Sequence, residues 1–223
     1  MIDVANDPGG REKLLALGVR NVPVVAKGEN YVFGQNLEDV AEFVGLQGTG
    51  HKPLPPDQLI KKWVMVLRAL QRYARQLPSD RIEENVIPNR PRSIRLLTHH
   101  AFRIAEAYLD TVEKGVEYSV GHANIPPKDG TCVTGAEIAE YGEGVIKRLE
   151  KWWAGVKDKT LSEKIKTYYG MQPIAVVFER STWHSAQHSR QLADVLERFK
   201  IQPDSKLTPQ DLAGLPLPER LYE

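Results

Sequence analysis

Four long segments of the chain carry apolar side chains at intervals of three and four residues, the period of a helix with one buried face. The first covers residues 55–77 and places Leu59, Trp63, Leu67, Leu70 and Ala74 on one stripe. The other three cover residues 93–115, 134–156 and 174–199. Helices of this kind must bury their apolar faces against one another, so the pattern predicts a mainly α fold built on a four-helix bundle.

The first part of the chain has a different pattern, with shorter apolar runs separated by turn residues. It predicts strands over 2–4, 22–26 and 30–33 and helices over 10–17 and 37–44, the last capped by Asn36. A Gly- and Pro-rich stretch, "GLQGTGHKPLPP", follows and predicts a linker. The predicted organisation is a small α/β segment over residues 1–46, a linker over 47–56 and a helical domain over 57–223.

Composition and charge limit which partners and which cellular location are expected. The 223 residues have a formal net charge of +1 and contain no Lys/Arg block, so no nucleic acid is predicted as a partner. No apolar run approaches the roughly 20 residues that span a bilayer, which excludes a membrane-spanning helix. Cys132 is the single cysteine, so no internal disulfide forms, and the first residues lack a signal-peptide pattern. These features predict a cytoplasmic protein.

The candidate chemistry lies in two of the long helices. His184 and His188 are four residues apart, so both imidazoles project from one helical face, as a divalent metal requires. The same spacing also occurs by chance, and hydrogen-bonded histidines are the alternative. His100 borders the apolar stripe of the 93–115 helix and is the predicted third ligand. His99 instead aligns with Arg103 on a line expected to face solvent.

From about Leu59 onward the chain resembles the DinB/YfiT-like family of metal-binding four-helix bundles. The residues that carry the resemblance are "SIRLLTHH", "YYGM", "WHSAQHSRQL" and "GLPLP". The family pattern implies a metal site of His100, His184 and His188 that holds Zn²⁺ or Ni²⁺. Counting seven residues from Ser93 selects His100, whereas the Leu-Leu-x-His variant of the pattern would select His99.

The stretch "GVRNVPVVAKGENYVFGQNLEDVAEFVGL" resembles the C-terminal half of a glutaredoxin, a thioredoxin-fold protein. The resemblance implies a cis peptide bond before Pro23. It also implies that the Cys-x-x-Cys half is missing, through a late start codon or through loss of half the domain, so no redox chemistry is predicted. Such a truncated unit should bury its apolar faces poorly, and we therefore expect a homodimer.

Two functions are compatible with these features. The first is a metal-dependent thiol S-transferase or related hydrolase that acts on a small molecule with a low-molecular-weight thiol. The alternative is a non-enzymatic metal-binding bundle whose glutaredoxin-like half-domain serves oligomerisation or partner binding. No residue is predicted as a catalytic acid. Gln191 follows His188 by three residues and is a candidate for the outer residue that hydrogen-bonds to a ligating histidine.

Overall fold

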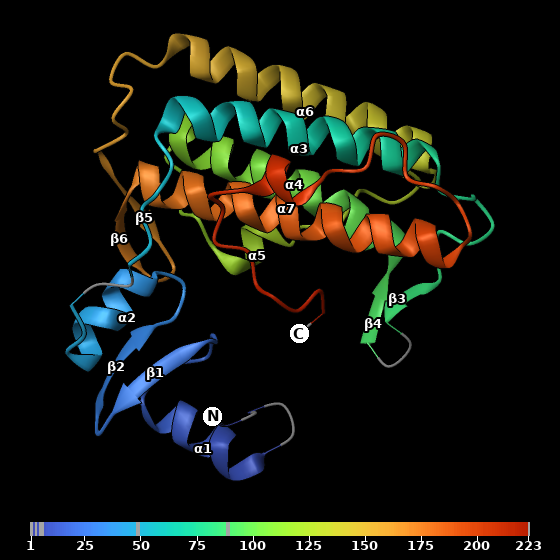
Figure 1. Ribbon diagram of the computed structural model, residues 1–223. Coiled ribbons are helices and arrows are strands. Elements are labelled where there is room, and N and C mark those ends of the chain that lie inside the picture. The colour runs from blue at the N-terminus through green and yellow to red at the C-terminus, as the bar shows by residue number, and fades with distance from the viewer. Residues whose placement is uncertain (1, 3, 5–6, 48–49, 88–89, 223) are drawn as a thin grey trace. The chain divides into compact units, whose positions relative to one another are not determined.

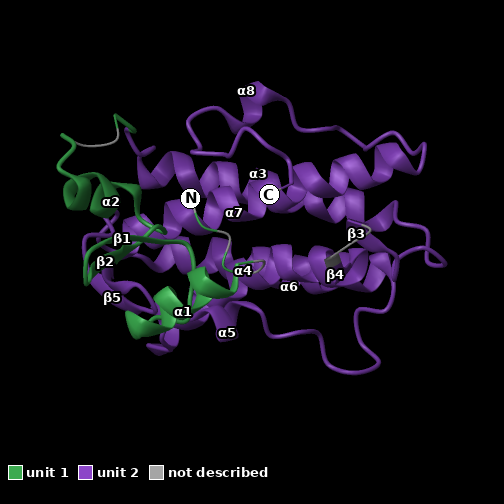
Figure 2. Ribbon diagram, turned by 90° about the horizontal axis from the view of Figure 1, so that it is seen from below, with its two compact units in different colours: residues 1–51 green, residues 52–223 purple. Residues whose placement is uncertain are grey.

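The computed structural model describes residues 2, 4, 7–47, 50–87 and 90–222 (Figure 1). The chain is mainly helical, with small two-stranded sheets. It divides into two compact units, residues 1–51 and residues 52–223, which are coloured separately in Figure 2. This boundary falls inside the stretch predicted as a linker. Among the described helices, none combines the length and the apolar composition that crossing a membrane requires.

The first unit contains two short helices and one hairpin. Its elements in chain order are α1 (Pro8–Ala16), β1 (Val24–Lys27), β2 (Asn30–Phe33) and α2 (Leu37–Val44). The two strands are antiparallel, with Val24 opposite Phe33. The Asn36 side chain accepts a hydrogen bond from the Glu38 amide at 3.0 Å and caps α2, as predicted.

Two predictions for this unit have clear outcomes. The Val22–Pro23 peptide bond is cis, which confirms that prediction. The strand predicted over residues 2–4 is wrong for the described residues Ile2 and Val4, which are not in a strand, and Asp3 lies outside the described residues. Among the described residues, β1 and β2 pair only with each other, so the first sheet has two strands.

The second unit is dominated by four helices of 20 or more residues, which lie side by side in Figure 1. They are α3 (Pro56–Arg75), α4 (Ile94–Lys114), α6 (Gly135–Gly155) and α7 (Ile174–Arg198). Helices α3 and α4 each pack against both α6 and α7. Shorter elements connect them: β3 (Asn85–Ile87), β4 (Arg90–Ser93), α5 (Val120–Ala123), β5 (Lys164–Thr167) and β6 (Gly170–Pro173). A last short helix, α8 (Pro209–Leu212), follows α7.

Aromatic rings from the long helices form the centre of the core. Trp63 on α3, Tyr108 on α4 and Phe178 on α7 are fully buried, and their ring centroids lie 5.4 Å from one another. Trp152 on α6 joins them, 5.2 Å from Tyr108. Rings of this size bury large apolar areas, so the contact ties all four helices together.

Hydrogen bonds beside the core fix the positions of α3, α4 and α7 along their axes relative to one another. The indole nitrogen of Trp63 donates to Ser185 Oγ at 3.0 Å, and Ser185 Oγ donates to the Ala101 carbonyl at 3.1 Å. All three groups are buried, so a slide of one helix would leave polar atoms without partners. Ser185 follows His184, and Ala101 follows His100. The same hydrogen bonds therefore fix the position of His100 on α4 relative to His184 on α7.

Candidate metal centre

The structure brings His100, His184 and His188 together. One potential ligand atom from each side chain lies within 4.8 Å of those of the other two. The ring centroids are 5.5 Å apart for His100 and His184, 5.1 Å for His100 and His188, and 4.8 Å for His184 and His188. His100 and His188 are buried, and His184 is partly buried. Helix α4 supplies one histidine and α7 supplies two.

Hydrogen bonds orient two of the three rings. His100 Nδ1 lies 3.0 Å from the Ala123 carbonyl oxygen, which can only accept, so Nδ1 carries the proton and Nε2 is left with a lone pair. Gln191 Nε2 donates to the Leu221 carbonyl at 2.9 Å, which turns Gln191 Oε1 toward His188. His188 Nδ1 then donates to this oxygen at 2.7 Å, and Nε2 of His188 is again the nitrogen with a lone pair.

The remaining nitrogens show that the residues fit a metal ion. His188 Nε2 and His184 Nδ1 are buried and have no hydrogen-bond partner in the described protein. A buried polar atom without a partner is costly, and coordination of a cation removes that cost for an imidazole lone pair. A histidine that binds a metal is usually neutral, with its other ring nitrogen held by a hydrogen bond. His100 and His188 have this form.

The electrostatic environment keeps these imidazoles neutral. Burial, with the positive charge of Arg92 as the second cause, lowers the pKa of His188 to about 4, against the opposing effect of its hydrogen bond to Gln191. Burial also lowers the pKa of His100 and of His184 well below the usual value, with added repulsion from the neighbouring histidines. Neutral imidazole is the form that binds a metal, so the site is ready to do so at neutral pH.

His99 faces another part of the molecule. Its ring stacks on Tyr141 of α6 with centroids 4.8 Å apart and an interplanar angle of 17°. The predicted solvent-facing line was wrong, because His99 and Arg103 are each only 6% exposed. Helix α6 covers this face, and Tyr141 donates a hydrogen bond to Glu106 at 2.7 Å. Burial, the main cause, lowers the pKa of His99 to about 4.

Another histidine and the single cysteine lie outside the three-histidine cluster. His122 on α5 hydrogen-bonds to Asp110 at 3.1 Å, so it belongs to a polar network between α4 and α5. Cys132 is a free, buried cysteine, and burial raises the pKa of its thiol. A thiol with a raised pKa is a weak nucleophile at neutral pH. The metal-ligating group found among the described residues contains neither of them.

Two residues that orient the histidines were not predicted from the sequence. The Ala123 carbonyl belongs to α5, a single helical turn that was not predicted. The Leu221 carbonyl lies near the C-terminus, in a segment without regular structure. Both act through backbone oxygens, which every residue has, so no side-chain pattern could identify them. Gln191, by contrast, was a candidate from its helical spacing, and it does hydrogen-bond to His188.

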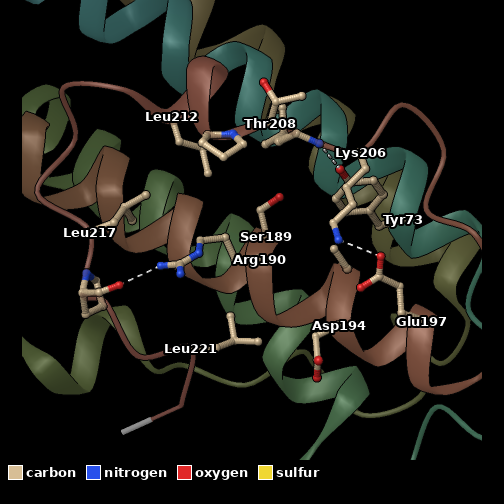
Figure 3. Close-up of a pocket in the computed structure, with 14 residues that line it drawn as sticks. Tyr73, Ser189, Arg190, Asp194, Glu197, Lys206, Thr208, Leu212, Leu217 and Leu221 are labelled. Atoms are coloured by element: carbon tan, nitrogen blue, oxygen red, sulfur yellow. Dashed lines mark hydrogen bonds and ion pairs between the residues drawn. The ribbon is translucent and has the colours of Figure 1, made fainter.

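A cavity of about 550 Å³ lies on another face of α7 (Figure 3). Helix α7 contributes Ser189, Arg190 and Asp194 to its lining, and the segment that follows α7 contributes Lys206 and Leu217, among others. Arg190 donates to the Pro218 carbonyl at 2.9 Å and to Gln187 Oε1 at 2.8 Å. None of the three clustered histidines lines this cavity, so it is separate from the candidate metal centre.

A scan against models of protein families finds none that matches this chain, and no curated protein shows significant similarity to it. The function must therefore be argued from the site itself.

Proposed function

We propose that the second unit is a DinB-like four-helix bundle that holds Zn²⁺ or Ni²⁺ on His100, His184 and His188. The observation that carries the proposal is the convergence of three neutral imidazoles, two of them with the non-coordinating nitrogen already engaged. Three histidines leave a coordination position open, as in catalytic rather than structural sites.

The proposed reaction is a metal-dependent thiol S-transfer or a related hydrolysis on a small molecule. A divalent metal in an open three-histidine site favours the thiolate form of a bound thiol or the hydroxide form of a bound water. The chain's own residues orient the ligands: Ala123 holds His100, and Gln191 holds His188.

Elemental analysis of untagged protein tests the metal. We expect about one divalent ion per chain, with loss of the ion in His100→Ala, His184→Ala and His188→Ala. His99→Ala is the matched control, because His99 is adjacent in sequence, equally buried and stacked on Tyr141 instead. A wild-type protein that binds no divalent ion, or a His99→Ala protein that loses it, would contradict the proposed site.

The alternative function is a non-enzymatic metal-binding bundle whose first unit, a glutaredoxin-like half-domain, mediates oligomerisation. The α–β–β–α order of the first unit is the support for that half-domain. Assays of the metal-loaded protein with a thiol and a small electrophile separate the two functions. Turnover that is lost in His188→Ala favours the enzyme, and metal binding without turnover favours the alternative.

A further inference from the structure

Two arginines beside the histidines lack acidic partners. Arg92 is on β4, and Arg180 is on α7, one turn before His184. Neither forms an ion pair with any described residue. The nearby Arg103 is different, since it pairs with Glu106 at 2.5 Å and with Asp110 at 3.4 Å. A partly buried guanidinium without a counterion is unfavourable, so an anion from outside the chain would stabilise it.

Aromatic side chains hold the Arg180 guanidinium in place. Its central carbon lies 5.7 Å from the Tyr169 ring centroid and 6.0 Å from that of Trp183. One terminal nitrogen donates to the Tyr168 hydroxyl at 3.4 Å, while Nε is buried without a hydrogen-bond partner. The guanidinium is therefore positioned by its neighbours and still has donor capacity.

Arg180 and His184 share one face of α7, because residues four apart on a helix are neighbours. The Trp183 ring, which the Arg180 guanidinium contacts, lies 5.8 Å from the His184 ring. The positive charge of Arg180 also contributes to the lowered pKa of His184, after burial and the other two histidines. Arg92 is on β4, which leads directly into α4, the helix that carries His100. Its positive charge is among the causes of the lowered pKa of all three histidines.

The charges near the site do not balance. Three neutral histidines contribute no charge, and the metal-ligating group found among the described residues contains no carboxylate. A divalent ion would add two positive charges to those of Arg92 and Arg180. A ligand that completes the site should therefore bring more negative charge than one thiolate supplies.

We propose that the thiol bound at this site carries a carboxylate, that Arg180 binds this carboxylate, and that Arg92 provides a general preference for anions. This inference rests on the proposed function. The planar guanidinium matches a carboxylate with two parallel hydrogen bonds, which gives Arg180 a role in selecting the thiol. Arg92 has no hydrogen bond to a described residue that would fix its orientation, so its effect is expected to depend on charge alone.

The test compares two thiols of equal length, 3-mercaptopropionate and 3-mercapto-1-propanol, on Co²⁺-loaded protein. Their Kd values are read from the thiolate-to-cobalt charge-transfer absorption. Hydrogen bonds to charged groups predict that Arg180→Gln lowers the preference for the carboxylate thiol by about ten- to a hundredfold. Arg92→Gln should weaken binding of both thiols and change their ratio much less than Arg180→Gln does, because Arg92 acts through its charge and not through paired hydrogen bonds to the carboxylate.

Arg190→Gln is the control, because Arg190 is on the same helix and its guanidinium is occupied by Gln187 and Pro218. Cobalt stoichiometry and circular dichroism must match the wild type in each variant. If Arg180→Gln fails this check, Arg180→Lys, which keeps the charge but loses the paired geometry, should show a reduced preference. An equal preference in wild type and variant overturns the inference while thiol binding stands. Absence of the absorption with both thiols on cobalt-loaded protein overturns the proposed function as well.

Discussion

Adjacent histidines on α4 have different neighbours, and the reason lies in which helix covers each of them. His100 turns toward α7 and meets His184 and His188, whereas His99 turns toward α6 and stacks on Tyr141. The apolar stripe of α4 predicted that His100 borders the buried face of the helix. It could not reveal that His99 is also buried, because α6 covers that side chain and the sequence of α4 does not show where α6 packs.

Gln191 offers a test of ligand orientation at the scale of one hydrogen bond. Gln191→Leu removes the acceptor that holds His188 Nδ1, so we expect metal affinity to fall by about 10- to 100-fold with little change in helical content. Gln187→Leu is the matched control. Gln187 also donates to the Leu221 carbonyl, at 2.7 Å, but has no contact with the histidines among its hydrogen bonds. Competition with a chelator of known affinity measures the effect, and equal affinities in the two variants would contradict it.

Buried histidines also predict how stability depends on pH in the metal-free protein. The pKa values of His99 and His188 are lowered to about 4, mainly by burial, whereas an unfolded histidine titrates near 6.5. The unfolded chain therefore binds protons first as the pH falls. The stability of the folded state is complete above about pH 6.5 and decreases toward pH 4, by on the order of 3 kcal/mol for each group.

Urea unfolding of chelator-treated protein at pH 7.5, 6 and 5 measures this dependence. The midpoint should fall over this range, above the pH at which most carboxylates titrate. His99→Gln should show a smaller decrease than the wild type, because one of the buried groups is gone. A midpoint that stays constant from pH 7.5 to 5 would show that these histidines are not buried as the structure has them.

At the scale of elements, the long helices and their ends could be predicted because their signals are local. The stripe of α3 and the Ser93 cap of α4, whose hydroxyl accepts from the Leu96 amide, depend only on neighbouring residues in sequence. The β3–β4 and β5–β6 hairpins were not predicted. Their strands are as short as β1 and β2, but β4 (RPRS) and β6 (GMQP) contain no β-branched or aromatic residue, whereas β1 (VVAK) and β2 (NYVF) do. Helix α5, which orients His100, is equally short.

A polar network between helices was also beyond sequence reasoning. Asp110 on α4 is 7% exposed and pairs with Lys114 at 2.8 Å, with Arg148 of α6 at 2.9 Å and with His122 of α5 at 3.1 Å. Burial alone would raise the pKa of Asp110, but the hydrogen bonds from Lys114 and Arg148 lower it to about 2. The carboxylate thus remains charged and connects three elements.

Asp110→Asn should destabilise the protein by about 2–4 kcal/mol, because it leaves the buried Arg103 and the partly buried Arg148 with fewer counterions. Glu113→Gln is the control. Glu113 also pairs with Arg148, at 2.7 Å, but is more exposed and should contribute less than about 1 kcal/mol. Urea unfolding at pH 7 gives both values. Similar small losses in the two variants would mean that the network adds little to the packing of α4 against α6.

At the scale of the whole molecule, the first unit has little core of its own. Its buried apolar side chains among the described residues are Val19 and Ala41. Leu37 and Val44, seven residues apart on α2, are 55% and 46% exposed, and Leu46 is 64% exposed. Apolar side chains grouped in this way are typical of a surface that another chain covers.

The homodimer stays a prediction, and the exposed apolar side chains of α2 are the surface expected to form the contact. Light scattering of the full chain at micromolar concentration should give twice the mass of one chain. The double change Leu37→Glu, Val44→Glu should give the mass of a single chain, because charges would have to be buried at the contact. Val133→Glu is the control, since Val133 is similarly exposed, at 45%, but belongs to the second unit. Metal content should be the same in all three proteins, because the three histidines come from α4 and α7. A monomeric wild type would contradict the predicted dimer, and a dimer that survives the double change would place the contact elsewhere.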